Sequence, residues 1–234
     1  MSSCRVLTVL GMHRSGTSCL VEGLESAGVA ACVSGDPHLG PLREHVEIML
    51  LNESVLNQSW GSWADPPKRI KWTQEHRAAR DRFIERHRPS SGVWLFKDPR
   101  TLLMLEFWQE AIPELELVGI FRSPMAVAKS LTTHLGQLPV ERGLSLWQAY
   151  NRRLFDYRKR SAFPVLTFDS GDGFLKGFGS LLNALKLTPQ RDGFDFFTPS
   201  KVHNNVWQAA PVPDQIDQLW RALRSITGAL GRSP

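Results

Sequence analysis

The sequence predicts an α/β fold in which a mostly parallel sheet is covered by helices on both faces. Short apolar runs recur along the chain, separated by longer stretches with a helical pattern of apolar residues. Runs this short are typical of strands buried on both faces of a parallel sheet, and their alternation with helices is typical of α/β proteins. A third observation is a glycine-containing turn between the first strand and the first helix, where phosphate-binding loops occur.

The expected strands are the apolar runs at 6–10, 93–96, 115–121 and 164–168. The first run precedes an expected helix at 16–27, which has Leu20, Val21 and Leu24 on one face. Further helices are expected at 41–58, 74–88, 101–111, 125–134, 144–160 and 213–230. The glycine-rich segment 168–180 is expected to form a surface loop that leads into a helix. No repeat or linker divides the chain, so we expect a single domain, 1–234.

Composition and cysteine usage are those of an ordinary globular protein. Hydrophobic residues make up 42% and charged residues 22% of the 234 residues. No segment approaches the roughly 18 consecutive apolar residues of a membrane span, and the start of the chain does not resemble a secretory leader. Cys4, Cys19 and Cys32 have neither paired nor metal-type spacing, which favours reduced thiols. We therefore expect a cytoplasmic protein without a transmembrane segment.

The formal charge of +5 comes from one stretch of the chain. Segment 68–88 holds eight Lys or Arg residues against three acidic residues. Such a run is most often a solvated helix face, and the main alternative is a surface for an anionic substrate or a membrane. A nucleic-acid partner is not expected, because the basic residues are not interleaved with aromatic residues.

The loop after the first expected strand reads GMHRSGTS and has the features of an anion site. Gly11 and Gly16 have the spacing of a phosphate-binding loop, but Thr17 stands where nucleoside-triphosphate loops carry lysine. Backbone N–H groups at the start of the following helix, with its dipole, favour an anion. Arg14 adds a charged fork and Ser18 a hydroxyl. The candidate ligand-binding residues of this loop are Gly11, His13, Arg14, Ser15, Gly16, Thr17 and Ser18.

The loop favours a 5′-phosphate that is not part of a metal-chelated triphosphate. No apolar run ends in a clear magnesium-binding aspartate. The nearest candidate, Asp169, is followed by a glycine-rich segment and could equally be a helix cap. We therefore expect no metal requirement.

A second anion site is predicted where the strand at 115–121 ends. Arg122 follows this strand, and Ser130 lies two turns along the next expected helix, where its hydroxyl can face the same region. The alternative is that Arg122 caps the strand and Ser130 is solvated. Two anion sites at one sheet edge would suit a nucleoside that carries phosphates on two sides.

These segments resemble the sulfotransferases that use 3′-phosphoadenosine 5′-phosphosulfate (PAPS). GMHRSGTS is similar to the family's 5′-phosphosulfate loop, FRSPMAVAKSL to its 3′-phosphate motif, and WLFKDPR to a Lys-Asp-Pro segment of tyrosylprotein and bacterial members. The resemblance runs from about 6 to 131. It implies the sulfotransferase version of the P-loop α/β fold, PAPS as donor and adenosine 3′,5′-bisphosphate as product. In a late basic loop, it makes Lys201 and His203 candidate contacts to the 3′-phosphate.

The resemblance also suggests which residues take part in the reaction. Lys97 is the candidate cation for the leaving oxygen, with Arg14 second, although Lys97 could simply pair with Asp98. Glu44 is the favoured base and His45 the alternative, since only one of two adjacent residues on a helix would face the site. Arg43 departs from the family's usual aromatic, and both candidate bases could instead be surface residues.

Two other functions stay open at this stage. A P-loop kinase would need the lysine that Thr17 replaces. A sulfotransferase-like module without activity could bind a nucleotide or a glycan only. For the enzyme, the expected partner is a small-molecule or carbohydrate acceptor, a hydroxyl or amine of a glycan, glycolipid or metabolite.

Overall fold

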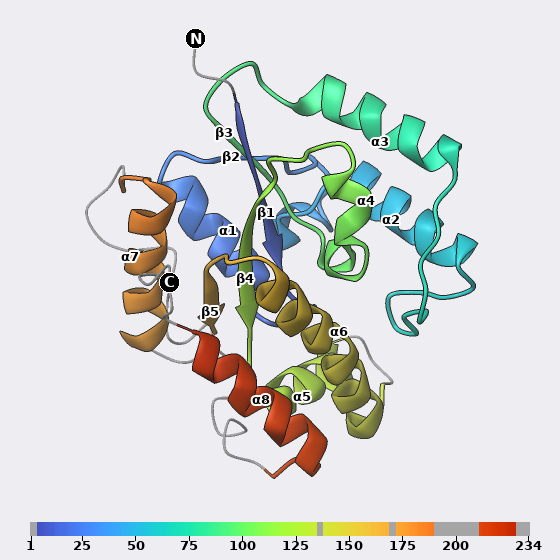
Figure 1. The fold of residues 1–234 in the computed structure, drawn as a ribbon, viewed down its shortest axis with the longest axis vertical. Coiled ribbons are helices and arrows are strands. Elements are labelled where there is room, and N and C mark those ends of the chain that lie inside the picture. The colour runs from blue at the N-terminus through green and yellow to red at the C-terminus, as the bar shows by residue number, and fades with distance from the viewer. Residues whose placement is uncertain (1–3, 135–137, 169–171, 190–210, 228–234) are drawn as a thin grey trace.

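The computed structural model describes residues 4–134, 138–168, 172–189 and 211–227 (Figure 1). Within them, one fully parallel sheet has the strand order β2-β3-β1-β4-β5. The strands are β1 (Arg5–Leu10), β2 (Ala30–Ala31), β3 (Val93–Phe96), β4 (Glu116–Phe121) and β5 (Val165–Thr167). Because β1 is the central strand, the loop that follows it lies in the middle of the carboxyl edge of the sheet.

Helices cover both faces of this sheet, as the sequence predicts. The helices are α1 (Thr17–Ser26), α2 (Val46–Gln58), α3 (Gln74–His87), α4 (Leu105–Gln109), α5 (Pro124–His134), α6 (Val140–Arg160), α7 (Asp172–Leu185) and α8 (Asp214–Ile226), with short 3-10 turns η1 (Gly40–Leu42) and η2 (Pro99–Leu103). Helices α1 and α7 pack on one face, and the other helices pack on the opposite face (Figure 1). The α/β architecture is therefore confirmed.

Alternate strand residues supply the two cores. In β4, Leu117 and Phe121 join the cluster under α6 and α8, whereas Val118 and Ile120 join the cluster under α1 and α7. Successive strand residues point to opposite faces, so a strand covered on both sides must be apolar throughout. This is the physical reason for the unbroken apolar runs in the sequence.

Two predicted helices are shorter than expected. The helix expected at 41–58 begins only at Val46, because η1 precedes it and Arg43 has a left-handed φ of 55°. The helix expected at 101–111 is divided into η2 and α4. Glu44 therefore lies in a connection and His45 is the N-cap of α2, so helical periodicity does not decide which of them faces the site.

The expectation of a surface loop at 168–180 that leads into a helix is wrong over 172–180, which are helical, whereas 169–171 lie outside the described residues. Helix α7 begins at Asp172. Its apolar residues Phe174, Phe178 and Leu181 recur at helical spacing and are buried, and this burial outweighs the low helix propensity of the glycines. Strand β2 was not expected, since two alanines give no strand pattern.

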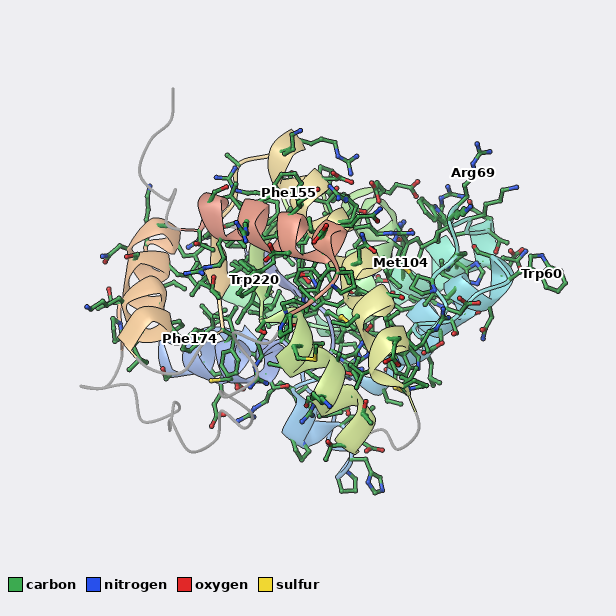
Figure 2. All side chains as sticks on the ribbon, turned by 90° about the horizontal axis from the view of Figure 1, so that it is seen from below. Trp60, Arg69, Met104, Phe155, Phe174 and Trp220 are labelled. Carbon is green, nitrogen blue, oxygen red and sulfur yellow. The ribbon has the colours of Figure 1, made fainter. Side chains whose placement is uncertain are left out.

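The side chains follow the same division between core and surface (Figure 2). Phe174 of α7 and Trp220 of α8 point into the molecule, whereas Trp60 is 97% exposed and projects outward. Over the ranges that the structure describes, no helix is both long and apolar enough to cross a membrane.

Candidate functional site

The loop between β1 and α1 needs both of its glycines. A Cβ on Gly11 would lie 2.7 Å from the carbonyl oxygen of Ile120, and Gly16 has a φ of 88°. A Cβ on Gly16 would also lie 2.3 Å from the ring of Phe168. The loop is thus held against the ends of β4 and β5, and it delivers the chain directly into α1 at Thr17.

The start of α1 has the properties of an anion site. Gly16 is the N-cap of α1, and as a glycine it offers no side chain to cap the N–H groups of the first turn. The buried Ser15 hydroxyl has no hydrogen-bond partner among the described residues. A buried polar group without a partner is uncommon, and an anion at this helix end would satisfy such donors.

Arg14 extends from this loop to α5. Its Nε donates a hydrogen bond of 2.9 Å to Ser130 Oγ. No carboxylate among the described residues forms an ion pair with Arg14, and burial lowers the pKa of the guanidinium. The structure therefore brings together Arg14 and Ser130, two predicted site residues separated by 116 positions in the chain.

Arg122 lies at the end of β4 in the same region. Its guanidinium is over the ring of Phe168, 5.6 Å from the centroid, and its carbonyl oxygen accepts a 2.9 Å hydrogen bond from Trp147 Nε1. Burial and the positive charge of Arg14 lower the pKa of Arg122 to about 10. A buried and a half-buried arginine that repel each other would gain from a shared anion.

Lys97 and Glu44 form a buried ion pair beside the start of α1. Lys97 Nζ is 2.8 Å from Glu44 Oε1, and it also donates to the carbonyl oxygen of Leu42 and, at 3.4 Å, to Ser18 Oγ. The Lys97 side chain is only 1% exposed. Burial outweighs the mutual attraction, so the pKa of Glu44 is raised and that of Lys97 is lowered. Burial thus favours the neutral form of each group.

The rest of the KDPR segment holds Lys97 in place. Asp98 is fully buried and accepts hydrogen bonds from the Arg100 backbone N–H, at 2.8 Å, and from Asn52 Nδ2, at 3.2 Å. Arg100 also pairs with Asp98, at 3.0 Å, and with Glu53, at 2.5 Å. The charges of Asp98 and Arg100 are thus used within the fold, and Lys97 is the residue of this segment that contacts the α1 start.

The two candidate bases have separate surroundings. His45 Nδ1 accepts the Glu47 N–H at 3.2 Å as the cap of α2, and its ring packs against Phe83 and His87. Glu44 alone of the pair contacts Lys97. Both residues are buried, so neither is a surface residue.

His13 lies among the cations of the site. Its ring packs on Trp63 and Tyr150, with centroids at 4.7 and 6.1 Å, and its buried Nδ1 has no hydrogen-bond partner among the described residues. Burial, and then the nearby positive charges of Arg100, Lys97 and Arg14, hold the pKa of His13 well below its usual value. His13 is therefore neutral at pH 7.

Three predicted residues are not described by the structure, and two residues of the site were not predicted. Lys201, His203 and Asp169 lie outside the residues that the structure describes. Sequence reasoning missed Asn52 and Phe168 as parts of the site. Phe168 ends an apolar run that was assigned to the core, and nothing in the sequence around Asn52 marks it as a partner of Asp98.

Three of the eight basic residues of segment 68–88 pair with carboxylates. Arg77 pairs with Glu110 at 2.9 Å, Arg80 with Asp81 at 2.8 Å, and Arg86 with Glu47 at 2.8 Å. These pairs support the interpretation of a solvated helix face for α3.

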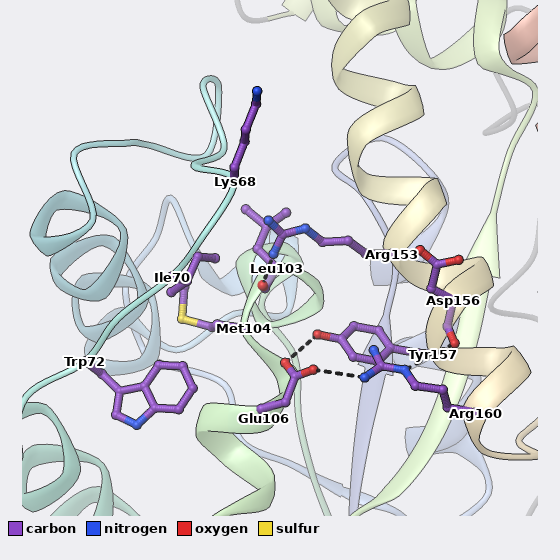
Figure 3. A pocket seen from close by; sticks show the side chains of 10 residues that line it. All are labelled: Lys68, Ile70, Trp72, Leu103, Met104, Glu106, Arg153, Asp156, Tyr157 and Arg160. Atoms are coloured by element: carbon purple, nitrogen blue, oxygen red, sulfur yellow. Dashed lines mark hydrogen bonds and ion pairs between the residues drawn. The ribbon is translucent and has the colours of Figure 1, made fainter.

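A separate pocket of about 340 Å³ lies between this segment and α6 (Figure 3). Its charged groups are partly used within the protein: Arg153 donates to the carbonyl oxygens of Leu103 and Pro67, and Arg160 is 3.6 Å from Glu106. None of the residues assigned to the candidate site lines this pocket.

A comparison with solved structures gives an independent measure of the fold. The chain is similar to the sulfotransferase domain from the Synechococcus PCC 7002 olefin synthase, with a TM-score of 0.53 and 15% identity, over 94% of each chain. At this identity the likeness shows the fold alone, which is sulfotransferase-like. No protein-family model and no curated protein matches the sequence.

Proposed function

We propose that this protein is a sulfotransferase that moves a sulfonate group from PAPS to a hydroxyl or amine of an acceptor. The observation that carries the proposal is the half-buried Arg14, which is bonded to Ser130 and has no ion pair with a described carboxylate, beside the buried Arg122 at the carboxyl edge of the sheet. A site with this charge favours a ligand with more than one anionic group.

Different residues of the site would hold the 5′-phosphosulfate and the 3′-phosphate of such a donor. The loop at 11–18 and the start of α1 would hold the 5′-phosphosulfate, with the Ser15 hydroxyl available as a donor. Arg122 and Ser130 would hold the 3′-phosphate, and Arg14 links the two groups through its bond to Ser130. Thr17 in the lysine position fits a phosphosulfate better than a triphosphate.

In the proposed reaction, the acceptor oxygen or nitrogen attacks sulfur in line with the bridging oxygen. The new bond to sulfur forms as the bond from sulfur to the bridging oxygen breaks, and adenosine 3′,5′-bisphosphate leaves. Glu44 takes the acceptor proton: its Oε1 is bonded to Lys97, which leaves Oε2 for this role. Lys97 stabilises the negative charge that develops on the leaving oxygen.

The first experiment is a calorimetric titration with adenosine 3′,5′-bisphosphate, adenosine 5′-monophosphate and ATP with magnesium. We expect tight binding of the bisphosphate alone, lost in Arg122→Ala and kept in the matched control Arg77→Ala on α3. Preference for ATP with magnesium would support a kinase instead and contradict the proposal.

A second experiment distinguishes an enzyme from a binding module. Release of adenosine 3′,5′-bisphosphate from PAPS is measured with a panel of glycan, glycolipid and small hydroxyl or amine acceptors. Turnover with at least one acceptor, lost in Glu44→Gln, is the expected result. Bisphosphate binding without turnover on any acceptor would favour the non-catalytic module.

A further inference from the structure

Three side chains of metal-binding residue types lie close together beside the connection that carries Glu44. Cys32 follows β2, His45 is the N-cap of α2, and His87 is the last residue of α3. One sulfur and one ring nitrogen from each histidine all lie within 4.8 Å of one another. Cys32 and His45 are buried, and the His87 side chain is 26% exposed.

The surroundings hold these groups in place. The Phe83 ring packs against both histidines, with centroid distances of 5.1 Å to His45 and 4.6 Å to His87. The two histidine rings are 4.7 Å apart in an edge-to-face arrangement. The Cys32 N–H donates to the carbonyl oxygen of Leu95 at 2.7 Å, which fixes this residue against β3.

A carboxylate also orients the outer histidine. Glu47 Oε1 is 3.4 Å from His87 Nε2, and Glu47 is in turn fixed by Arg86 at 2.8 Å. When a carboxylate accepts from one ring nitrogen, the other nitrogen keeps its lone pair, which is the usual arrangement of a metal-binding histidine. If His87 Nε2 carries the hydrogen that faces Glu47, Nδ1 is the nitrogen left for a metal.

We propose that Cys32, His45 and His87 bind one zinc ion, with water in the fourth position. A thiolate and two imidazoles are the ligand types that Zn²⁺ prefers, at about 2.0–2.3 Å in tetrahedral geometry. The present spacing requires the three side chains to move together only slightly. Zinc would replace the thiol proton of Cys32, and this proton is released to solvent.

His45 must exchange one bond for another. Its Nδ1 now accepts the Glu47 N–H. A zinc ion on Nδ1 would replace this bond directly, and one on Nε2 would require the tautomer with hydrogen on Nδ1, which also ends the cap. A metal–ligand bond is much stronger than one cap hydrogen bond, so the exchange favours the bound ion.

The ion would join the ends of β2, α2 and α3, which come from distant parts of the sequence. His45 is also next to Glu44, so the ion would fix the connection that brings Glu44 to Lys97. This is a positioning role, and it does not depend on the identity of the donor or the acceptor.

The test uses the full chain after removal of metal with a chelator, followed by titration with Zn²⁺ and, as a spectroscopic probe, Co²⁺. We expect one ion per chain, a thiolate-to-cobalt charge-transfer band, and a rise in Tm of about 5–10 °C at a hundredfold excess of zinc over its Kd. Cys32→Ser should lose the charge-transfer band, and His87→Gln should bind at least tenfold more weakly.

The matched controls are Cys4→Ser, at another buried cysteine, and His38→Ala, at an exposed histidine, and both should bind as the wild type does. His87→Gln alters a half-buried residue, and its metal-free Tm verifies that it folds. Absence of stoichiometric binding to the wild type, or an unchanged cobalt spectrum in Cys32→Ser, would overturn the proposal. Bisphosphate titration of the same samples reports on the donor site independently.

Discussion

The arginines of α3 and those at the carboxyl edge of the sheet differ in the groups that they contact. Along α3, Arg77, Arg80 and Arg86 all pair with carboxylates, and Arg86 is largely exposed. At the sheet edge, Arg14 is bonded to a serine hydroxyl, and Arg122 lies over an aromatic ring with its pKa lowered to about 10. The charge of Arg14, which forms no ion pair with a described carboxylate, is therefore available to an anion at the sheet edge.

The difference follows from solvation. An exposed arginine with a carboxylate partner gains little from a further anion, because water and its partner already stabilise the charge. A buried arginine beside another cation is poorly stabilised, so binding of an anion relieves both desolvation and repulsion. The segment with most basic residues is thus a poor guide to the anion site.

The largest effect is expected at the buried base. Glu44→Gln should lower the transfer rate by about 10²–10⁴, because a positioned base contributes this much. Burial raises the pKa of Glu44, and the ionised carboxylate is the active form, so the wild-type rate should fall as pH drops through this raised pKa. The kcat of wild type and variant is measured against pH, and an acid limb that persists in Glu44→Gln would exclude this role.

Replacement of the buried cation should have two separable effects. Lys97→Met should lower kcat by about 10²–10³ and also destabilise the fold by about 3–5 kcal/mol, because Glu44 is left buried without its partner. The double variant Lys97→Met/Glu44→Gln should recover stability in urea unfolding but not turnover. Recovered turnover would show that Lys97 serves only the ion pair.

The direct test of the two basic regions uses one arginine from each. Arg122→Ala should weaken bisphosphate binding by about 100-fold or more, since a buried charged contact is lost. Arg86→Ala, on α3, should leave the Kd unchanged. Titration calorimetry at one salt concentration measures both, and an equal loss in the two variants would contradict the comparison.

The smallest expected effect is on the pH dependence of stability, and it comes from the neutral His13. Because the pKa of His13 is held well below its usual value, the unfolded chain takes up a proton first as pH falls below about 6.5. Stability that is present above this pH is then lost, by about 1.4 kcal/mol for each pH unit at most. His13→Gln should remove this part of the slope in urea unfolding between pH 7 and 5.5. The same slope in both proteins would show that His13 is protonated in the fold.

The sequence was a good guide to local features and a poor one to the start of α2. Apolar runs located four of the five strands, and the glycine spacing located the loop at 11–18. Periodicity failed at 41–58, where the left-handed Arg43 delays the helix to Val46. The choice of Glu44 over His45 as the base stays a prediction, but the contact of Glu44 with Lys97 now supports it instead of the expected helical geometry.

By itself, the sequence determined four of the five strands, most of the helices, and which strand ends carry charged side chains. Both depend on residues close together in the chain, through backbone conformation and the burial of alternate or periodic side chains. Only the tertiary structure decided the partners: Glu44 with Lys97 across 53 positions, and Arg14 with Ser130 across 116. Pairing depends on distance in space and on burial, which the sequence does not give. Lys97 at a strand end and Arg86 in α3 could therefore be assigned different roles only after the fold showed which carboxylate lies beside each of them.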